Sequence, residues 1–255
     1  MEINRISRIT GSLLAIFLFL GTAAITTAQT VPGVFASAIT AAPTSTLTNG
    51  LVSYWKFDET SGTTANDDWG TTDLTNSGAT VNQAGTSGTS YQFAPNDYVG
   101  NIEAFKYTTA FSLSLMIRTS NTTGNEAPIG NFHWTGDGYD LVRMATTGYL
   151  EWTLRNSTSG SALVEYTTNV ADGNWHHVAC IYDGSYARLY VDGVAATPVA
   201  FSYTISYNAA NRFCIGTREN DDNFYTGYID EICVYNRALT ASEVSELDTN
   251  NGKPY

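Results

Sequence analysis

Few side chains in this 255-residue sequence are placed to perform acid–base or nucleophilic chemistry. There are 3 histidines, and two of them, His176 and His177, are neighbours in a strand-like apolar run. Adjacent residues of a strand point to opposite faces of the sheet, so this pair cannot hold one metal ion together. The sequence contains no Gly-x-Ser-x-Gly motif, which would mark a serine nucleophile. We therefore expect no shared metal ion at this pair and a protein that is not an enzyme.

A second group of side chains suits the recognition of a sugar, which has an apolar face and a polar rim. Two predicted loops, 131–139 and 220–225, combine aromatic with hydrogen-bonding residues. We predict six ligand contacts: Trp134, Tyr139, Arg143, Arg155, Asn220 and Tyr225. Because Trp is usually well buried, a core role for Trp134 is equally compatible with the sequence. Trp152 and Trp175 lie in alternating runs and are expected in the core.

Short runs with a period of two predict the strands that position these side chains. Phe111, Leu113, Leu115 and Ile117 alternate with other residues, and residues 51–57 alternate in the same way. Further runs occupy 149–154, 163–166, 175–182 and 188–191. Asp-Gly pairs at residues 172, 183 and 192 predict tight hairpin turns between such runs. Strands at this spacing predict an all-β sandwich or barrel. The succession of short strands is not interrupted by a second linker, which predicts one domain over residues 49–250.

The end of the chain carries the one helical pattern. Thr240 precedes residues 241–247, and Glu243 follows it at the spacing of a capping box. We therefore predict a short C-terminal helix.

Composition limits the classes of partner. Only 14% of residues are charged, against about 25% in an average domain. The formal net charge of -12 would repel a polyphosphate, so nucleic acid is not expected as a partner. The chain has 3 cysteines, Cys180, Cys214 and Cys233, an odd number that permits at most one internal disulfide bond. Buried thiols and one disulfide both remain compatible with the sequence.

The N-terminus predicts export. Arg5 and Arg8 precede the apolar run 13–20, and small residues end the segment at Ala28. Residues 1–29 are therefore a predicted signal peptide, and residues 30–48 a flexible linker without charge. An uncleaved membrane anchor is the alternative, but a spanning helix needs roughly 20 apolar residues. Either reading predicts a secreted or cell-surface protein, with membrane contact only through this segment.

Three segments together resemble a known family. Residues 51–62 are similar to the opening strand and turn of laminin-G-like domains of the concanavalin A-like lectin/glucanase superfamily. Residues 173–193 resemble their central hairpin, and residues 227–240 their closing strand and helix entry. The resemblance implies an antiparallel two-sheet jelly-roll sandwich with one concave sheet. It also implies an extracellular binding or adhesion module, often for carbohydrate and often with calcium.

The resemblance also informs the expected function. Glucanases of this fold typically carry a Glu-x-Asp-x-x-Glu pattern, and the nearest segment here, 219–224, lacks the second Glu. We expect a non-catalytic module that binds a glycan on the concave sheet or its loops. A structural or adhesive protein that contacts other proteins, or copies of itself, is the alternative.

The family implies a structural calcium ion held by Asp58 and Asp230, because the first and last strands lie close together in it. Asp67 or Asp68 are further possible oxygen donors. The alternative is that Asp58 only caps a turn and that Asp230 is solvated.

Overall fold

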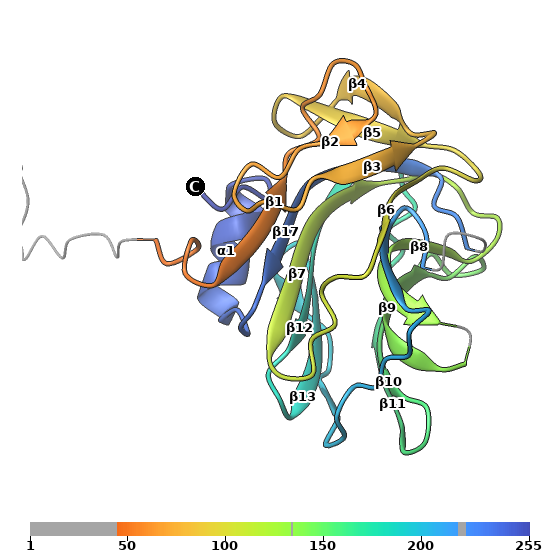
Figure 1. The fold of residues 1–255 in the computed structure, drawn as a ribbon, viewed down its shortest axis with the longest axis vertical. Helices are drawn as coiled ribbons and strands as arrows, with labels where there is room; N and C mark the ends of the chain where they lie inside the picture. The colour runs from red at the N-terminus through yellow and green to blue at the C-terminus, as the bar shows by residue number, and fades with distance from the viewer. Residues whose placement is uncertain (1–44, 134, 219–222) are drawn as a thin grey trace, which may run out of the picture. The chain divides into compact units, whose positions relative to one another are not determined.

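Two antiparallel sheets pack face to face in the computed structural model, which describes residues 45–133, 135–218 and 223–255 (Figure 1). This is the predicted all-β sandwich with a short C-terminal helix. The predicted signal segment, and the linker up to residue 44, lie outside the described residues. In the described part, no helix is long and apolar enough to cross a membrane.

The first sheet has nine strands among the described residues, in the order β14-β13-β12-β7-β17-β5-β4, with β1 paired to β17 and β15 to β13. Its strands are β1 (Leu51–Trp55), β4 (Thr80–Ala84), β5 (Thr89–Phe93), β7 (Phe111–Arg118), β12 (Trp175–Tyr182), β13 (Tyr186–Val191), β14 (Val194–Ala195), β15 (Val199–Ala200) and β17 (Gly227–Tyr235). The first and last long strands, β1 and β17, are therefore hydrogen-bonded neighbours.

The second sheet has eight strands in the described part, in the order β11-β10-β9-β8-β16-β6-β3-β2. These are β2 (Thr64–Ala65), β3 (Leu74–Ser77), β6 (Tyr98–Ile102), β8 (Glu126–His133), β9 (Asp137–Arg143), β10 (Leu150–Asn156), β11 (Gly160–Tyr166) and β16 (Arg212–Ile215). Segment 131–139, predicted as a ligand-binding loop, is instead the end of β8 and the start of β9, joined by a short turn.

The core lies between the sheets and follows the period of two. In β7 the side chains of Leu113, Leu115 and Ile117 are fully buried there, together with Trp152 of β10. Alternate residues of β7 point to the outer face of the first sheet. Apolar area removed from water in this layer is the main source of stability.

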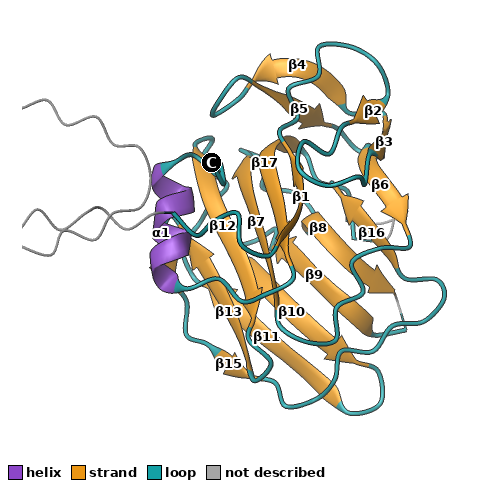
Figure 2. Ribbon diagram, turned by 60° about the vertical axis from the view of Figure 1, so that its left-hand side comes forward, coloured by secondary structure: helices purple, strands orange, loops and turns teal. Residues whose placement is uncertain are grey.

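Helix α1 (Ala241–Thr249) covers part of that outer face (Figures 1 and 2). Val244 and Leu247 pack there against Ala179 and Ile181 of β12 and against Tyr235 of β17. The predicted capping box is confirmed, because Thr240 and Glu243 exchange both of its hydrogen bonds. With α1 in place, β12 and β17 carry apolar residues on both of their faces.

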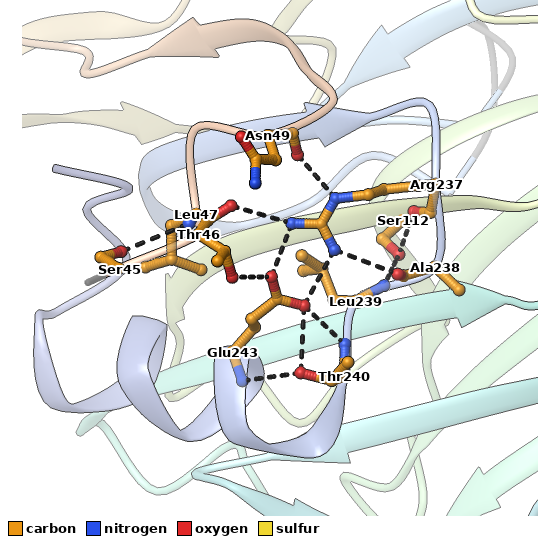
Figure 3. A network of polar contacts seen from close by, with 10 residues as sticks. All are labelled: Ser45, Thr46, Leu47, Asn49, Ser112, Arg237, Ala238, Leu239, Thr240 and Glu243. Carbon is orange, nitrogen blue, oxygen red and sulfur yellow. Dashed lines mark hydrogen bonds and ion pairs between the residues drawn. The ribbon is translucent and has the colours of Figure 1, made fainter. Parts of the chain in front are cut away.

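A polar network fastens α1 to the first sheet (Figure 3). The Arg237 guanidinium donates to both carboxylate oxygens of Glu243, at 2.7 and 2.8 Å. It also donates to the carbonyl oxygens of Asn49 and Thr46. Burial opposes ionisation of Glu243, but the bonds from Arg237 and Thr240 outweigh it and lower its pKa to about 2.

Two sequence expectations meet different outcomes here. The Asp-Gly pairs at 183 and 192 do connect β12, β13 and β14 as hairpins. The pair at 172 does not, because β11 and β12 belong to different sheets and the chain crosses between them. All three cysteines are buried and none of them forms a disulfide bond, so the disulfide alternative is not realised.

Candidate ligand-binding site

The two predicted metal ligands, Asp58 and Asp230, meet at the turn between β4 and β5. The Asp58 carboxylate accepts from the Thr89 N–H at 2.6 Å, and Asp230 accepts from the N–H and hydroxyl of Thr86 at 2.8 and 2.9 Å. Gly88 makes this approach possible, since it has a φ of +69° and an added Cβ would lie 2.2 Å from the Asp58 carboxylate. Asp230 is fully buried, so the alternative in which Asp230 is solvated is wrong.

Burial raises the pKa of the Asp230 carboxyl to about 7, against the hydrogen bonds from Thr86 and with help from the charge of Asp58. Glu231 is buried as well, although it follows Asp230 directly. A bulge in β17, with Glu231 at a φ of 52°, turns both side chains away from solvent. Burial raises the pKa of Glu231 to about 8, and its carboxylate accepts from the Tyr54 hydroxyl.

The remaining oxygen donors that were considered for a metal have other partners. Asp67 accepts from the backbone N–H groups of Tyr54, Gly70 and Thr72, and Asp68 pairs with Lys56 at 3.3 Å. In the described ranges, no group of three or more His, Cys, Asp or Glu side chains is arranged to hold a metal ion. The fold therefore brings together two of the predicted ligands, and any further donor would be a backbone carbonyl or water.

Three of the six predicted ligand contacts are inside the protein. Tyr139 and Tyr225 are fully buried, and the Tyr139 hydroxyl donates to the Phe105 carbonyl at 2.9 Å. Arg143 is also fully buried and forms an ion pair with Glu126 at 2.9 Å. Side chains without accessible surface cannot touch a ligand, so these three have structural roles instead.

Of the other three predicted contacts, Trp134 and Asn220 lie outside the described residues. Arg155 reaches the surface from β10, with its guanidinium 4.9 Å from the centre of the Phe132 ring. It pairs at 3.4 Å with the fully buried Asp140, which also lies 3.6 Å from Arg218. A shallow hollow of about 280 Å³ lies beside Arg155, lined also by Asn156 and residues of the β10–β11 turn.

A larger cavity, of about 640 Å³, lies on the first sheet, between the ends of β5 and β7 and the start of β17. Most of its lining side chains carry a hydroxyl or an amide. The lining residues are Gln92, Phe93, Pro95, Arg118, Thr119, Ser120, Asn121, Thr123, Gly173, Thr226, Gly227 and Tyr228. The sequence interpretation did not identify this site.

Strand register builds one wall of this cavity. Arg118 of β7 lies directly opposite Trp175 of β12 and directly opposite Tyr228 of β17. Its guanidinium is 4.0 Å from the centre of the Tyr228 ring and 4.9 Å from that of Trp175, within the range of cation–π attraction. Trp175 was expected in the core but is only partly buried, on the outer face of the sheet. Pairing across three strands leaves no short motif in the sequence, so this site could not be read from it.

His176 and His177 point to opposite faces of the sheet, as their adjacency in the sequence predicted. The His177 ring is buried and shares a 2.8 Å hydrogen bond with the Ser114 hydroxyl. His176 points the other way and contacts the carboxylates of Asp192 and Asp172, at 2.7 and 3.1 Å. Neither histidine faces the 640 Å³ cavity.

Family comparison agrees with this architecture. The family model described as concanavalin A-like lectin/glucanases superfamily, a laminin-G model, matches residues 85–245, which is more than half of the chain. The chain belongs to this laminin-G-like family. No curated protein matches the sequence.

Solved structures share the fold of this laminin-G-like domain at low sequence identity. Domain 4 of AbnA, a GH43 extracellular arabinanase from Geobacillus stearothermophilus solved with arabinotriose, is 19% identical with a TM-score of 0.65. That match covers 78% of this chain and 98% of domain 4. The receptor binding domain of botulinum neurotoxin D is 14% identical with a TM-score of 0.62, over 80% of this chain and 54% of that one. This laminin-G-like chain thus spans about half the length of the toxin domain.

Proposed function

We propose that this laminin-G-like domain is an exported, non-catalytic module that binds a carbohydrate in the cavity between β5, β7 and β17. The lining of that cavity carries the proposal. Hydroxyl and amide side chains there can both donate to and accept from sugar hydroxyls. Tyr228 adds an aromatic side chain, the type of group against which the apolar face of a sugar packs.

The same lining favours binding without catalysis. Glycoside hydrolysis needs two carboxyl groups beside the scissile bond. None of the described residues that line this cavity, or the hollow beside Arg155, is Asp or Glu. Domain 4 of AbnA shares the fold at 19% sequence identity and was solved with arabinotriose. That ligand supports the proposal that this chain also binds a glycan.

A glycan array probed with the full chain and with Tyr228→Ala tests the proposal. We expect the wild-type chain to retain specific glycans and the variant to lose them. Tyr186→Ala is the matched control, because Tyr186 is 43% exposed on β13 and does not line the cavity. Equal binding by Tyr228→Ala and wild type would place the glycan elsewhere, and no glycan signal at all would refute the function.

The second candidate function, adhesion to another protein, has one observation in its favour. Trp69 and Tyr255 are 44% and 59% exposed, and their ring centres lie 5.8 Å apart. Exposed aromatic groups of this kind are frequent anchors in protein interfaces. Capture of a defined protein partner that Trp69→Ser abolishes, together with an empty glycan array, would favour this candidate.

We also propose a structural calcium ion at Asp58 and Asp230. Carboxylate oxygens are the hard ligands that calcium prefers, and a dication would offset the repulsion by which Asp58 raises the pKa of Asp230. Calcium should then raise the melting temperature of the full chain. A melting temperature unchanged between EDTA and millimolar calcium contradicts the proposal.

A further inference from the structure

Arg118 differs from every other arginine that the structure describes. Each of the others forms an ion pair with a carboxylate of the chain. These arginines are Arg143, Arg155, Arg188, Arg212, Arg218 and Arg237. Among the described residues, no carboxylate or carbonyl oxygen accepts a hydrogen bond from the Arg118 guanidinium, which is held only by the two aromatic rings. In a chain with 24 acidic and 12 basic residues, an unpaired arginine is an exception that calls for a partner.

The two rings pack against the Arg118 guanidinium but accept no ordinary hydrogen bond from its N–H groups. A guanidinium has five N–H donors, all in its plane, and contact with a ring face uses none of them as an ordinary hydrogen bond. Tyr228 and Trp175 restrict the side chain, so less rotamer freedom is lost when a ligand binds. Arg118 therefore presents a partly buried and oriented set of donors in the wall of the 640 Å³ cavity.

We propose that the ligand of this cavity is an acidic saccharide whose carboxylate is bound by Arg118; this inference rests on the proposed glycan-binding function. A planar carboxylate matches the planar fork of a guanidinium in a bidentate pair, which is stronger than a neutral hydrogen bond. Polyphosphates are disfavoured by the net charge of -12, whereas a single carboxylate is attracted mainly by the nearest cation. Ser120 and Gln92 are then left for the sugar hydroxyls.

Matched pairs of glycans test the inference on the wild-type full chain. The array presents glucuronate with glucose, galacturonate with galactose, and sialylated lactose with lactose, so each pair differs by an acidic group. We expect an acidic member to bind about tenfold or more tightly than its neutral parent, which is about 1.4 kcal/mol. The pair that responds distinguishes a uronic from a sialic acid. Sulfated forms of the same neutral glycans carry a tetrahedral anion, and they should bind less tightly than the glycans that carry a carboxylate.

Arg118→Met keeps the apolar stem and removes the charge, and it should reduce the acidic glycan to the affinity of its neutral parent. Arg118→Lys should restore only part of the preference, because an ammonium is a point charge without the planar fork. Arg188→Met is the control, since Arg188 is also placed beside a ring, Tyr186, at 5.4 Å but lies away from the cavity. Equal binding of acidic and neutral members by the wild-type chain overturns the inference and leaves the proposed function standing. No binding of any glycan defeats both.

Discussion

The buried carboxyl groups of β17 predict that this domain loses stability as the pH rises. Asp230 and Glu231 are 0% and 1% exposed, and burial raises their pKa values to about 7 and about 8. Both groups are protonated in the folded domain at pH 5, whereas an unfolded chain ionises them near pH 4. Between about pH 4 and pH 8 the unfolded state binds fewer protons than the folded state. The contribution of the two protonated groups to the free energy of unfolding is therefore fully present below about pH 4 and is lost as the pH rises through 7 and 8.

The variant Glu231→Gln isolates one of the two groups. Gln keeps an acceptor for the Tyr54 hydroxyl and cannot ionise. Each pKa unit corresponds to about 1.36 kcal/mol, so the cost of ionising Glu231 is on the order of 4 kcal/mol. For a domain of this size that amounts to about 10 °C in melting temperature. The advantage of the variant over wild type should therefore grow by about this amount between pH 5 and pH 9.

Thermal unfolding in EDTA, followed by circular dichroism from pH 5 to 9, measures the effect. Glu246→Gln, on the partly exposed side of α1, is the control and should follow the wild-type curve. Parallel curves for wild type and Glu231→Gln would refute the reasoning. Calcium should flatten the wild-type curve, because a bound dication favours the ionised form of Asp230.

Three further predictions concern the network of α1, the buried ion pair and the thiols. Glu243→Gln should cost about 2 kcal/mol in urea unfolding, since it removes the charge paired with Arg237 and weakens the helix cap. Wild type should lose this contribution as the pH falls from about 4.5 through about 2, because the pKa of Glu243 is lowered, whereas the variant should not. Arg143→Met should cost about 3–5 kcal/mol by leaving Glu126 charged and unpaired, and a change under 1 kcal/mol in the same assay would contradict the ion pair. The three buried cysteines should resist a thiol reagent in the native chain and all react in denaturant; rapid native labelling would show that the thiols are accessible.

The period of two in the sequence was enough to predict most long strands and the sandwich. Leu113, Leu115 and Ile117 of β7 are buried at the spacing that predicted them. The alternation of side chains along β9 also indicated that two of the predicted ligand contacts are buried. Tyr139 and Arg143 alternate in step with the core residue Leu141, so they point inward. The chemistry of a side chain suggested binding where its position in the strand indicated burial.

Parity alone could not assign Trp175, because α1 covers the outer face of β12 and makes both faces of that strand apolar. The cap of α1 was visible in the sequence, since a capping box involves residues three apart. Local features of this kind depend on neighbours along the chain, and the sequence by itself therefore determined them.

Only the tertiary structure decided which distant residues share a site. Arg118, Trp175 and Tyr228 become neighbours through the register of three strands, β7, β12 and β17, that are far apart in the sequence. Asp58 and Asp230 meet because β1 pairs with β17 and both carboxylates bind the β4–β5 turn. Sheet register depends on contacts across the whole fold, which is why neighbours along the chain could not predict these partners.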